Sequence, residues 1–415
     1  MSWTLFGELS FAAGQWFSLM VVAKLGSPEA LGRYSLGLAV ATPIIIFANL
    51  HLRPIYVVDT RARWRFADYL GLRALLLPIA LAVTAAVCLV RGWPWQTAAV
   101  VALLGLIRVS GSVSDILYAR AQRAEKMTSI GISRATRGAL WIGLLALGLI
   151  IADEVVALAM VAGALGAHTL IYDLRKAGSY EVEDGEPERG LRPRFDRDAL
   201  ASLTREALPM GLAGGILGLS SNVFAFVLEH EHGLEAVGFF AAILSIRQAS
   251  GVVNMALGNA AIARLAKLSQ TDARGFWRLL VEMLGLVLVL NGAGLVLIVL
   301  IGDLFLRYAY TAAYVPYHPQ LILGSVAAVI MGLASMLSQT LTALSRFRLQ
   351  LVLNGLNLVA ALGFGLWRIP GGGVGGAVEA LVMLASFRCA MYVVANVLVG
   401  PRRGAKAAPP TAAGD

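Results

Sequence analysis

Long apolar runs separated by short polar breaks dominate the chain. The runs last about twenty residues each and are built from Leu, Ala, Val and Gly, without the short alternating segments of a membrane β-barrel. This pattern predicts membrane-spanning helices. Twelve spans are expected, near residues 4–24, 31–58, 67–90, 96–118, 134–152, 155–174, 205–229, 235–263, 277–303, 317–343, 349–368 and 373–399.

Composition agrees with the pattern and narrows the chemistry. Hydrophobic residues make up 58% of the chain, charged residues 14%, and the mean hydropathy is +0.74. These values are typical of a polytopic membrane protein and exclude a soluble globule. The two cysteines, Cys88 and Cys389, both fall inside expected spans, so we expect no disulfide framework. We therefore expect an all-α integral membrane protein without a metal site or a cofactor.

Basic residues are divided unevenly between the two sides of the expected membrane. With the N-terminus placed in the cytoplasm, most of the 34 Lys and Arg residues fall on the cytoplasmic side, as the positive-inside rule requires. The net charge of +9 is then a topology signal, and no nucleic-acid partner is expected. The pattern predicts a multi-pass protein with both termini in the cytoplasm.

A short internal repeat divides the chain into halves. The segment Glu29-Ala-Leu-Gly-Arg-Tyr34, at the start of the second span, has a counterpart in Glu235-Ala-Val-Gly-Phe-Phe240, at the start of the eighth. The spacing predicts two six-helix lobes in parallel orientation around a central cavity. The expected divisions are a first lobe (1–175), a flexible cytoplasmic linker (176–204), a second lobe (205–400) and a disordered cytoplasmic tail (401–415).

Three arginines, Arg108, Arg247 and Arg388, interrupt apolar runs near their middles. They belong to the fourth, eighth and twelfth expected spans, about 16–22 Å below the outer surface at 1.5 Å per residue, so they share one depth. A permanent cation there costs about 2.5–3.5 kcal/mol on insertion scales, and a carboxylate, a water-filled cavity or an anionic ligand compensates for it. Because the planar guanidinium binds phosphate bidentately, the pattern predicts a phosphate-bearing substrate.

Ion pairing is the alternative to substrate binding for these arginines. Arg388 has Glu379 as a candidate partner across the bundle, and Arg108 has Asp115 two turns along its own helix. In either case the arginine would be part of the architecture and not of a binding site.

Further arginines lie at the cytoplasmic ends of the spans and have two interpretations. Either they form a cationic vestibule that attracts an anion toward the mid-span arginines, or they only set topology and anchor lipid headgroups. Glu8, in the first span, either titrates with substrate or proton or forms a structural ion pair. The arginines concerned are Arg53, Arg134, Arg137 and Arg205.

Glycines are dense at the start of the seventh span, where Gly214 and Gly215 lie in the stretch 209–218. Each glycine weakens a helix by about 1 kcal/mol relative to Ala, which favours a hinge. Small residues also allow two membrane helices to pack closely, and this interpretation stays open beside the hinge.

Residues near the second and third spans resemble a known family. Phe47-Ala-Asn-Leu-His-Leu-Arg53, Asp59 and Asp68-Tyr-Leu-Gly-Leu-Arg73 are similar to the signature of polysaccharide-biosynthesis membrane proteins of the O-antigen flippase type. That family belongs to the superfamily of multidrug, oligosaccharidyl-lipid and polysaccharide exporters.

The resemblance implies a fold and an activity. Two lobes would form a V in the bacterial inner membrane and move an undecaprenyl-pyrophosphate-linked oligosaccharide between leaflets by alternating access, with other polysaccharide assembly proteins as partners. No enzymatic activity is implied. Two alternatives stay open: a cation-coupled drug antiporter, whose cavity would need carboxylates, and a non-transporting scaffold of a polysaccharide assembly complex.

Overall fold

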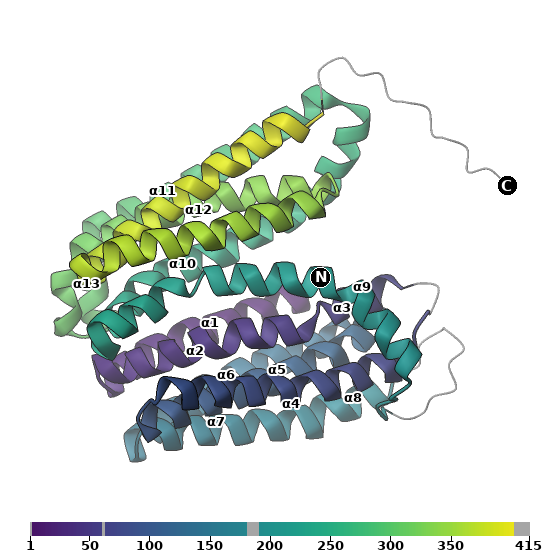
Figure 1. The fold of residues 1–415 in the computed structure, drawn as a ribbon, viewed down its shortest axis with the longest axis horizontal. Coiled ribbons are helices and arrows are strands. Elements are labelled where there is room, and N and C mark those ends of the chain that lie inside the picture. Colours follow the sequence, from purple (N-terminus) through teal and green to yellow (C-terminus); the bar gives the residue numbers. More distant parts are fainter. Residues whose placement is uncertain (1, 60–62, 181–190, 402–415) are drawn as a thin grey trace.

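Helices form almost all of the described chain. The computed structural model describes residues 2–59, 63–180 and 191–401, and no strand occurs among them. The helices are arranged in two lobes that meet at one end and diverge at the other (Figure 1). The prediction of an all-α, two-lobed membrane protein is confirmed.

The first lobe contains eight helices and one π-helical turn. Between α2 and α3 the chain breaks at Leu50 and His51, which both have a left-handed φ, of 46° and 52°. The elements are α1 (Ser2–Leu25), α2 (Pro28–Asn49), α3 (Leu52–Val58), α4 (Phe66–Arg91), α5 (Trp95–Arg123), α6 (Met127–Ile151), α7 (Glu154–His168), the π-helical turn Thr169–Asp173 and α8 (Leu174–Gly178).

The rest of the chain forms longer helices, three of which are interrupted by a residue with non-helical dihedral angles; in α11 this residue is Ile301. Gly233 in α10 and Gly373 in α13 have φ values of 79° and 53°, which glycine adopts without steric strain. The elements are α9 (Arg197–Ser220), α10 (Val223–Thr271), α11 (Ala273–Ala309), a 3₁₀ turn (Ala312–Tyr317), α12 (His318–Ala343) and α13 (Phe347–Val399).

Many of the described helices are long and apolar enough to span a membrane. Among the described residues, nine helical stretches are long and apolar enough to cross a membrane, and two of these contain the breaks at Gly233 and Gly373. The chain is therefore a multi-pass membrane protein, while the exact number of twelve spans stays a prediction.

The expected linker, 176–204, is only partly a connection. Residues 181–190 lie outside the described residues, as do 402–415 of the expected tail, but α9 begins at Arg197 instead of 205. Asp196 explains this earlier start, because its carboxylate accepts the Asp198 and Ala199 N–H groups at 3.1 and 3.2 Å. The Ala199 N–H also lowers the pKa of Asp196. Residues 197–204 are thus helix and not flexible linker.

The segment before α9 lies across the start of α4. The Arg194 N–H donates to the Ala67 carbonyl at 2.9 Å, and the Arg194 side chain lies 3.6 Å from the Asp68 carboxylate. A Cβ on Gly71 would be only 1.9 Å from the Arg194 carbonyl oxygen. Gly71 therefore allows the segment between the lobes to approach α4 closely, and Asp68 attracts the Arg194 side chain of that segment.

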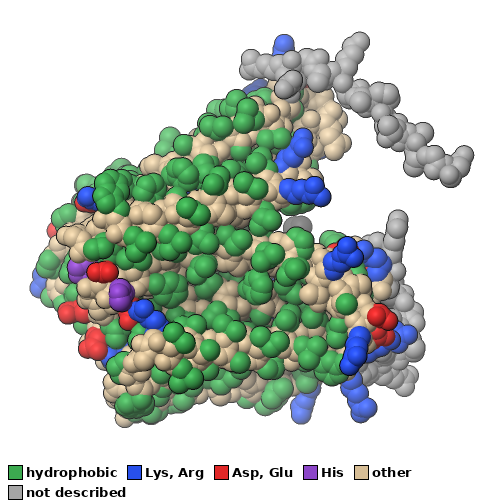
Figure 2. All heavy atoms as spheres, in the orientation of Figure 1, with side chains coloured by type: hydrophobic (Ala, Val, Ile, Leu, Met, Phe, Trp, Pro, Cys, Tyr) green, Lys and Arg blue, Asp and Glu red, His purple; other side chains and the backbone are tan. Residues whose placement is uncertain are grey.

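The two lobes share one apolar core where they meet. Its buried side chains come from both halves of the chain, including Val22 and Leu31 from the first lobe and Phe240 and Leu321 from the second. The Trp16 indole N–H adds a hydrogen bond of 3.1 Å to the Ser245 carbonyl across the interface. At the opposite end, Lys and Arg side chains gather around the gap between the lobes, whereas the surface between the ends is mainly hydrophobic (Figure 2).

Candidate functional site: an arginine-lined cavity between the lobes

A cavity of about 590 Å³ lies between α1, α2, α5 and α6 on one side and α10 on the other. Its wall is largely apolar, with a small set of aromatic, amide and cationic side chains. This composition is typical of a binding site for an organic ligand. The polar and aromatic lining residues include Trp16, Tyr34, Arg108, Trp141, Asn222 and Gln248.

Arg108 supplies the positive charge of this cavity. Its guanidinium carbon lies 5.9 Å from the ring centroid of Trp141, and it makes no hydrogen bond or ion pair with any described residue. The Trp141 ring is itself held in place, because its indole N–H donates to the Tyr34 hydroxyl at 3.2 Å. The cavity thus contains a permanently charged arginine that has no carboxylate partner among the described residues.

Arg247 and Arg388 lie close enough together in the second lobe to repel each other. Neither lines the 590 Å³ cavity, although Gln248, next to Arg247, does. The Nε atoms of both arginines are buried without a hydrogen-bond partner, and Arg388 lies 5.6 Å from the ring of Tyr392. Two half-buried cations without a carboxylate partner among the described residues are unfavourable inside a membrane, and an anion bound between them would relieve this cost.

The ion pairs proposed as alternatives are wrong, because both carboxylates have other partners. Glu379 pairs with Arg368, which precedes the break in α13. Asp115 lies 3.1 Å from Arg53 and 4.0 Å from Arg73. The three mid-span arginines therefore form no ion pair among the described residues.

The structure does not join the other candidate arginines into one vestibule. Arg53 pairs with Asp115 and donates to the side-chain oxygen (Oε1) of Gln122 at 3.1 Å, and Arg134 pairs with Glu8. Of the two roles considered for Glu8, titration or a structural ion pair, the contact with Arg134 corresponds to the ion pair. Arg205 is exposed on α9 and makes no hydrogen bond or ion pair with a described residue.

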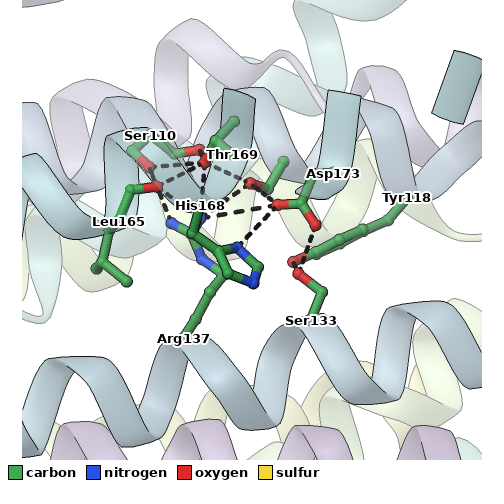
Figure 3. Close-up of polar contacts among 9 residues, drawn as sticks. Ser110, Tyr118, Ser133, Arg137, Leu165, His168, Thr169 and Asp173 are labelled. Atoms are coloured by element: carbon green, nitrogen blue, oxygen red, sulfur yellow. Dashed lines mark hydrogen bonds and ion pairs between the residues drawn. The ribbon is translucent and has the colours of Figure 1, made fainter. Parts of the chain in front are cut away.

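Arg137 belongs to a buried polar network inside the first lobe (Figure 3). Its guanidinium donates to the hydroxyls of Ser110, Ser114 and Thr169 at 2.8–3.1 Å and lies 3.8 Å from Asp173. Asp173 in turn accepts from Ser114 at 2.6 Å and Ser133 at 2.5 Å. Arg137 is 2% exposed and its guanidinium is hydrogen-bonded within this network, while its role in substrate binding stays a prediction.

Gly214 and Gly215 lie against α2. A Cβ on Gly214 would be 2.8 Å from the His51 ring, and one on Gly215 would be 3.2 Å from the Phe47 Cβ. These distances are those of close helix packing, while the hinge stays a prediction.

The aromatic residues of the cavity, Trp16, Tyr34 and Trp141, were not predicted from the sequence. A single aromatic residue in an apolar run gives no indication that it lines a binding site.

Comparisons with known proteins agree with this architecture. No protein-family model matches the chain. The capsular polysaccharide biosynthesis protein CapF of Staphylococcus aureus is 20% identical over 355 residues, which cover 85% of this chain and 87% of CapF.

Two solved structures are similar over nearly the whole chain. The inward-facing conformation of a multidrug resistance MATE family transporter of the MOP superfamily has a TM-score of 0.73 at 14% identity and covers 94% of each chain. The lipid II flippase MurJ, in an inward closed conformation, has a TM-score of 0.72 at 11% identity and covers 95% of this chain and 87% of MurJ. At these identities the likeness shows the fold alone, a two-lobed helical architecture.

Proposed function

We propose that this protein is a flippase that moves a polyprenyl-pyrophosphate-linked oligosaccharide across the bacterial inner membrane. The observation that carries the proposal is the set of three arginines inside apolar spans, none of which has a carboxylate partner among the described residues. The oligosaccharide would be an O-antigen, capsule or exopolysaccharide unit.

A pyrophosphate supplies the missing counter-charge. Buried cations are costly in a membrane, and hydrogen bonds between guanidinium and phosphate are among the strongest in proteins. Arg108 would bind one end of the anion in the cavity, and Arg247 and Arg388 of the second lobe would approach the anion when the lobes rearrange. The aromatic and amide residues of the cavity suit the sugar next to the phosphate, since they combine apolar faces with a few hydrogen-bonding groups.

The shape of the two lobes supports alternating access as the mechanism. The lobes diverge at the end where Lys and Arg gather, and the positive-inside rule assigns this end to the cytoplasm (Figure 2). The cavity would load there, and rocking of lobes 1–175 and 205–400 would expose the headgroup on the other side. The names of CapF and MurJ, which mention a capsular polysaccharide and lipid II, support a lipid-linked saccharide as substrate.

A drug antiporter is the second candidate, since the MATE transporter shares the fold. A cation-coupled antiporter needs a titratable carboxylate in contact with its substrate cavity. Among the described residues that line the 590 Å³ cavity, none is acidic and one is an arginine. This charge favours an anionic substrate over a cationic drug.

Transport in proteoliposomes tests the proposal. We expect purified protein to move a lipid-linked oligosaccharide to the leaflet where an impermeant reagent modifies it. Arg108→Ala, Arg247→Ala and Arg388→Ala should each lower the rate about tenfold or more, and Lys should restore it only in part. Arg264→Ala, at an exposed and unpartnered arginine, is the control. Near-normal rates in all three alanine variants would contradict the proposal.

A further inference from the structure

A second concavity, the α2–α4–α9 groove, lies where α9 of the second lobe packs beside α2 and α4 of the first lobe. It has a volume of about 550 Å³, and every lining residue is apolar, including Pro43 and Phe47 of α2, Ile79 and Val83 of α4, and Leu212 and Ile216 of α9. The three helices run side by side, with α2 packed against both others (Figure 1). Phe47, Ile79 and Val83 are 43–56% exposed, so the groove faces the lipid.

One helix separates this groove from the arginine-lined cavity. Tyr34, Leu38 and Thr42 of α2 line the cavity, whereas Pro43 and Phe47 line the groove. The two concavities are therefore opposite faces of the same helix. A lipid chain in the groove would lie one helix away from the unpaired Arg108.

Arg205 lies on the same stripe of α9 as the apolar wall of the groove. Arg205, Leu212, Ile216 and Leu219 are spaced close to whole helical turns, so their side chains share one face. Arg205 precedes Leu212 by two turns, about 10 Å. It is exposed and has no partner among the described residues. The groove is thus followed, on the diverging side of the lobes, by a free cation.

We propose that the α2–α4–α9 groove and Arg205 form a loading site for a polyprenyl phosphate lipid, with the isoprenoid chain in the groove and the phosphate at Arg205. The inference rests on the proposed function. The groove would hold the substrate at the stage before its headgroup enters the arginine-lined cavity. A single groove lined by α2, α4 and α9 offers room for one lipid chain beside one phosphate. A polyprenyl phosphate has one chain, whereas a glycerophospholipid has two, which favours the isoprenoid lipid as occupant.

Photolabelling in nanodiscs tests this site without requiring transport. The probe is undecaprenyl phosphate with a diazirine in its chain, in phosphatidylcholine nanodiscs that contain the full-length protein. We expect labelled peptides from 76–87 and 212–219. Excess unlabelled undecaprenyl phosphate should remove this labelling, and the same excess of phosphatidylglycerol should not.

Two variants separate the cation from the groove. Arg205→Ala should lower labelling about fivefold while Arg205→Lys retains most of it, since an exposed charge contact contributes modestly. Ile216→Trp fills the groove and should lower labelling with Arg205 intact. The matched controls are Arg264→Ala and Val289→Trp, the latter at a 67% exposed position of α11, and neither should change labelling.

Equal competition by phosphatidylglycerol, or unchanged labelling in both Arg205→Ala and Ile216→Trp, would overturn the loading site. Different results would contradict the proposed function and the loading site. If labelling follows the expected pattern but no oligosaccharide moves in proteoliposomes, the loading site stands and the flippase proposal is wrong. If transport occurs and labelling maps elsewhere, the loading site is wrong.

Discussion

Gly32 of α2 and Gly238 of α10 make the same contact in opposite directions. A Cβ on Gly32 would lie 1.8 Å from the Leu234 carbonyl oxygen, and one on Gly238 would lie 2.0 Å from the Pro28 carbonyl oxygen. Gly238 and Leu234 are the counterparts of Gly32 and Pro28 in the internal repeat. The repeat segments therefore cross each other where the lobes meet, and a glycine in each copy permits the close approach.

Alanine at either glycine should weaken the joined end of the lobes. The added Cβ would meet backbone, which cannot move aside, so we expect Gly32→Ala and Gly238→Ala each to destabilise the protein by about 1–3 kcal/mol. The measurement is the thermal unfolding midpoint of the purified protein in detergent. Gly292→Ala is the matched control, because a Cβ there meets nothing within 4 Å. Equal midpoints for Gly32→Ala and Gly292→Ala would contradict the crossing described here.

The Arg137–Asp173 network should act on stability and not on substrate binding. Arg137→Leu leaves the buried Asp173 carboxylate without its cation, and breaking such a pair costs about 3–5 kcal/mol. We expect a lower unfolding midpoint and lower membrane yield. Adding Asp173→Leu should recover part of the loss, because both charges are then removed. Transport per folded molecule should stay near wild type, and a selective transport defect at normal stability would place Arg137 in the substrate path.

Apolar runs predicted the helical class because lipid imposes length and hydrophobicity on each span, whereas the internal repeat predicted the two lobes. The start of α9 shows where this signal ends. Arg197, Asp198 and Arg205 make its first turns polar, so the apolar run begins only afterwards, while the helix begins at the Asp196 cap. A helix cap is a local hydrogen bond to backbone N–H groups, so a hydropathy pattern does not reveal where the helix begins.

The partners of charged residues were harder to predict than their depth. Asp115 was a candidate partner of Arg108 by helical spacing, but it pairs with Arg53 instead. This pair depends on the left-handed break at Leu50 and His51, which directs α3 back toward α5. Neither residue is a glycine, so the sequence gives no sign of the break. The sequence alone predicted that the arginines lie in the middle of their spans. That they have no carboxylate partner among the described residues became visible only in the three-dimensional structure.

Thiol labelling of intact cells tests the orientation in the membrane. In a background without Cys88 and Cys389, we expect Ser27→Cys to react with an impermeant reagent and Ser179→Cys to react only after permeabilisation. Both serines are exposed, so access to solvent on the correct side decides the result. Labelling at 179 but not at 27 in intact cells would reverse the topology and place the diverging end of the lobes outside the cell.

The glycines of α9 allow hinge and packing to be separated by position. Gly214→Ala would crowd the His51 ring, so a packing role predicts a lower unfolding midpoint for this variant. Gly218 is different, because its nearest neighbours, Ile46 and Pro43, would lie 3.4–3.5 Å from an added Cβ, an ordinary contact distance. Gly218→Ala therefore stiffens the helix by about 1 kcal/mol of propensity without a clash. If α9 bends during transport, Gly218→Ala should slow oligosaccharide movement severalfold at an unchanged midpoint. Normal transport by Gly218→Ala, together with a destabilised Gly214→Ala, would leave these glycines as packing residues only.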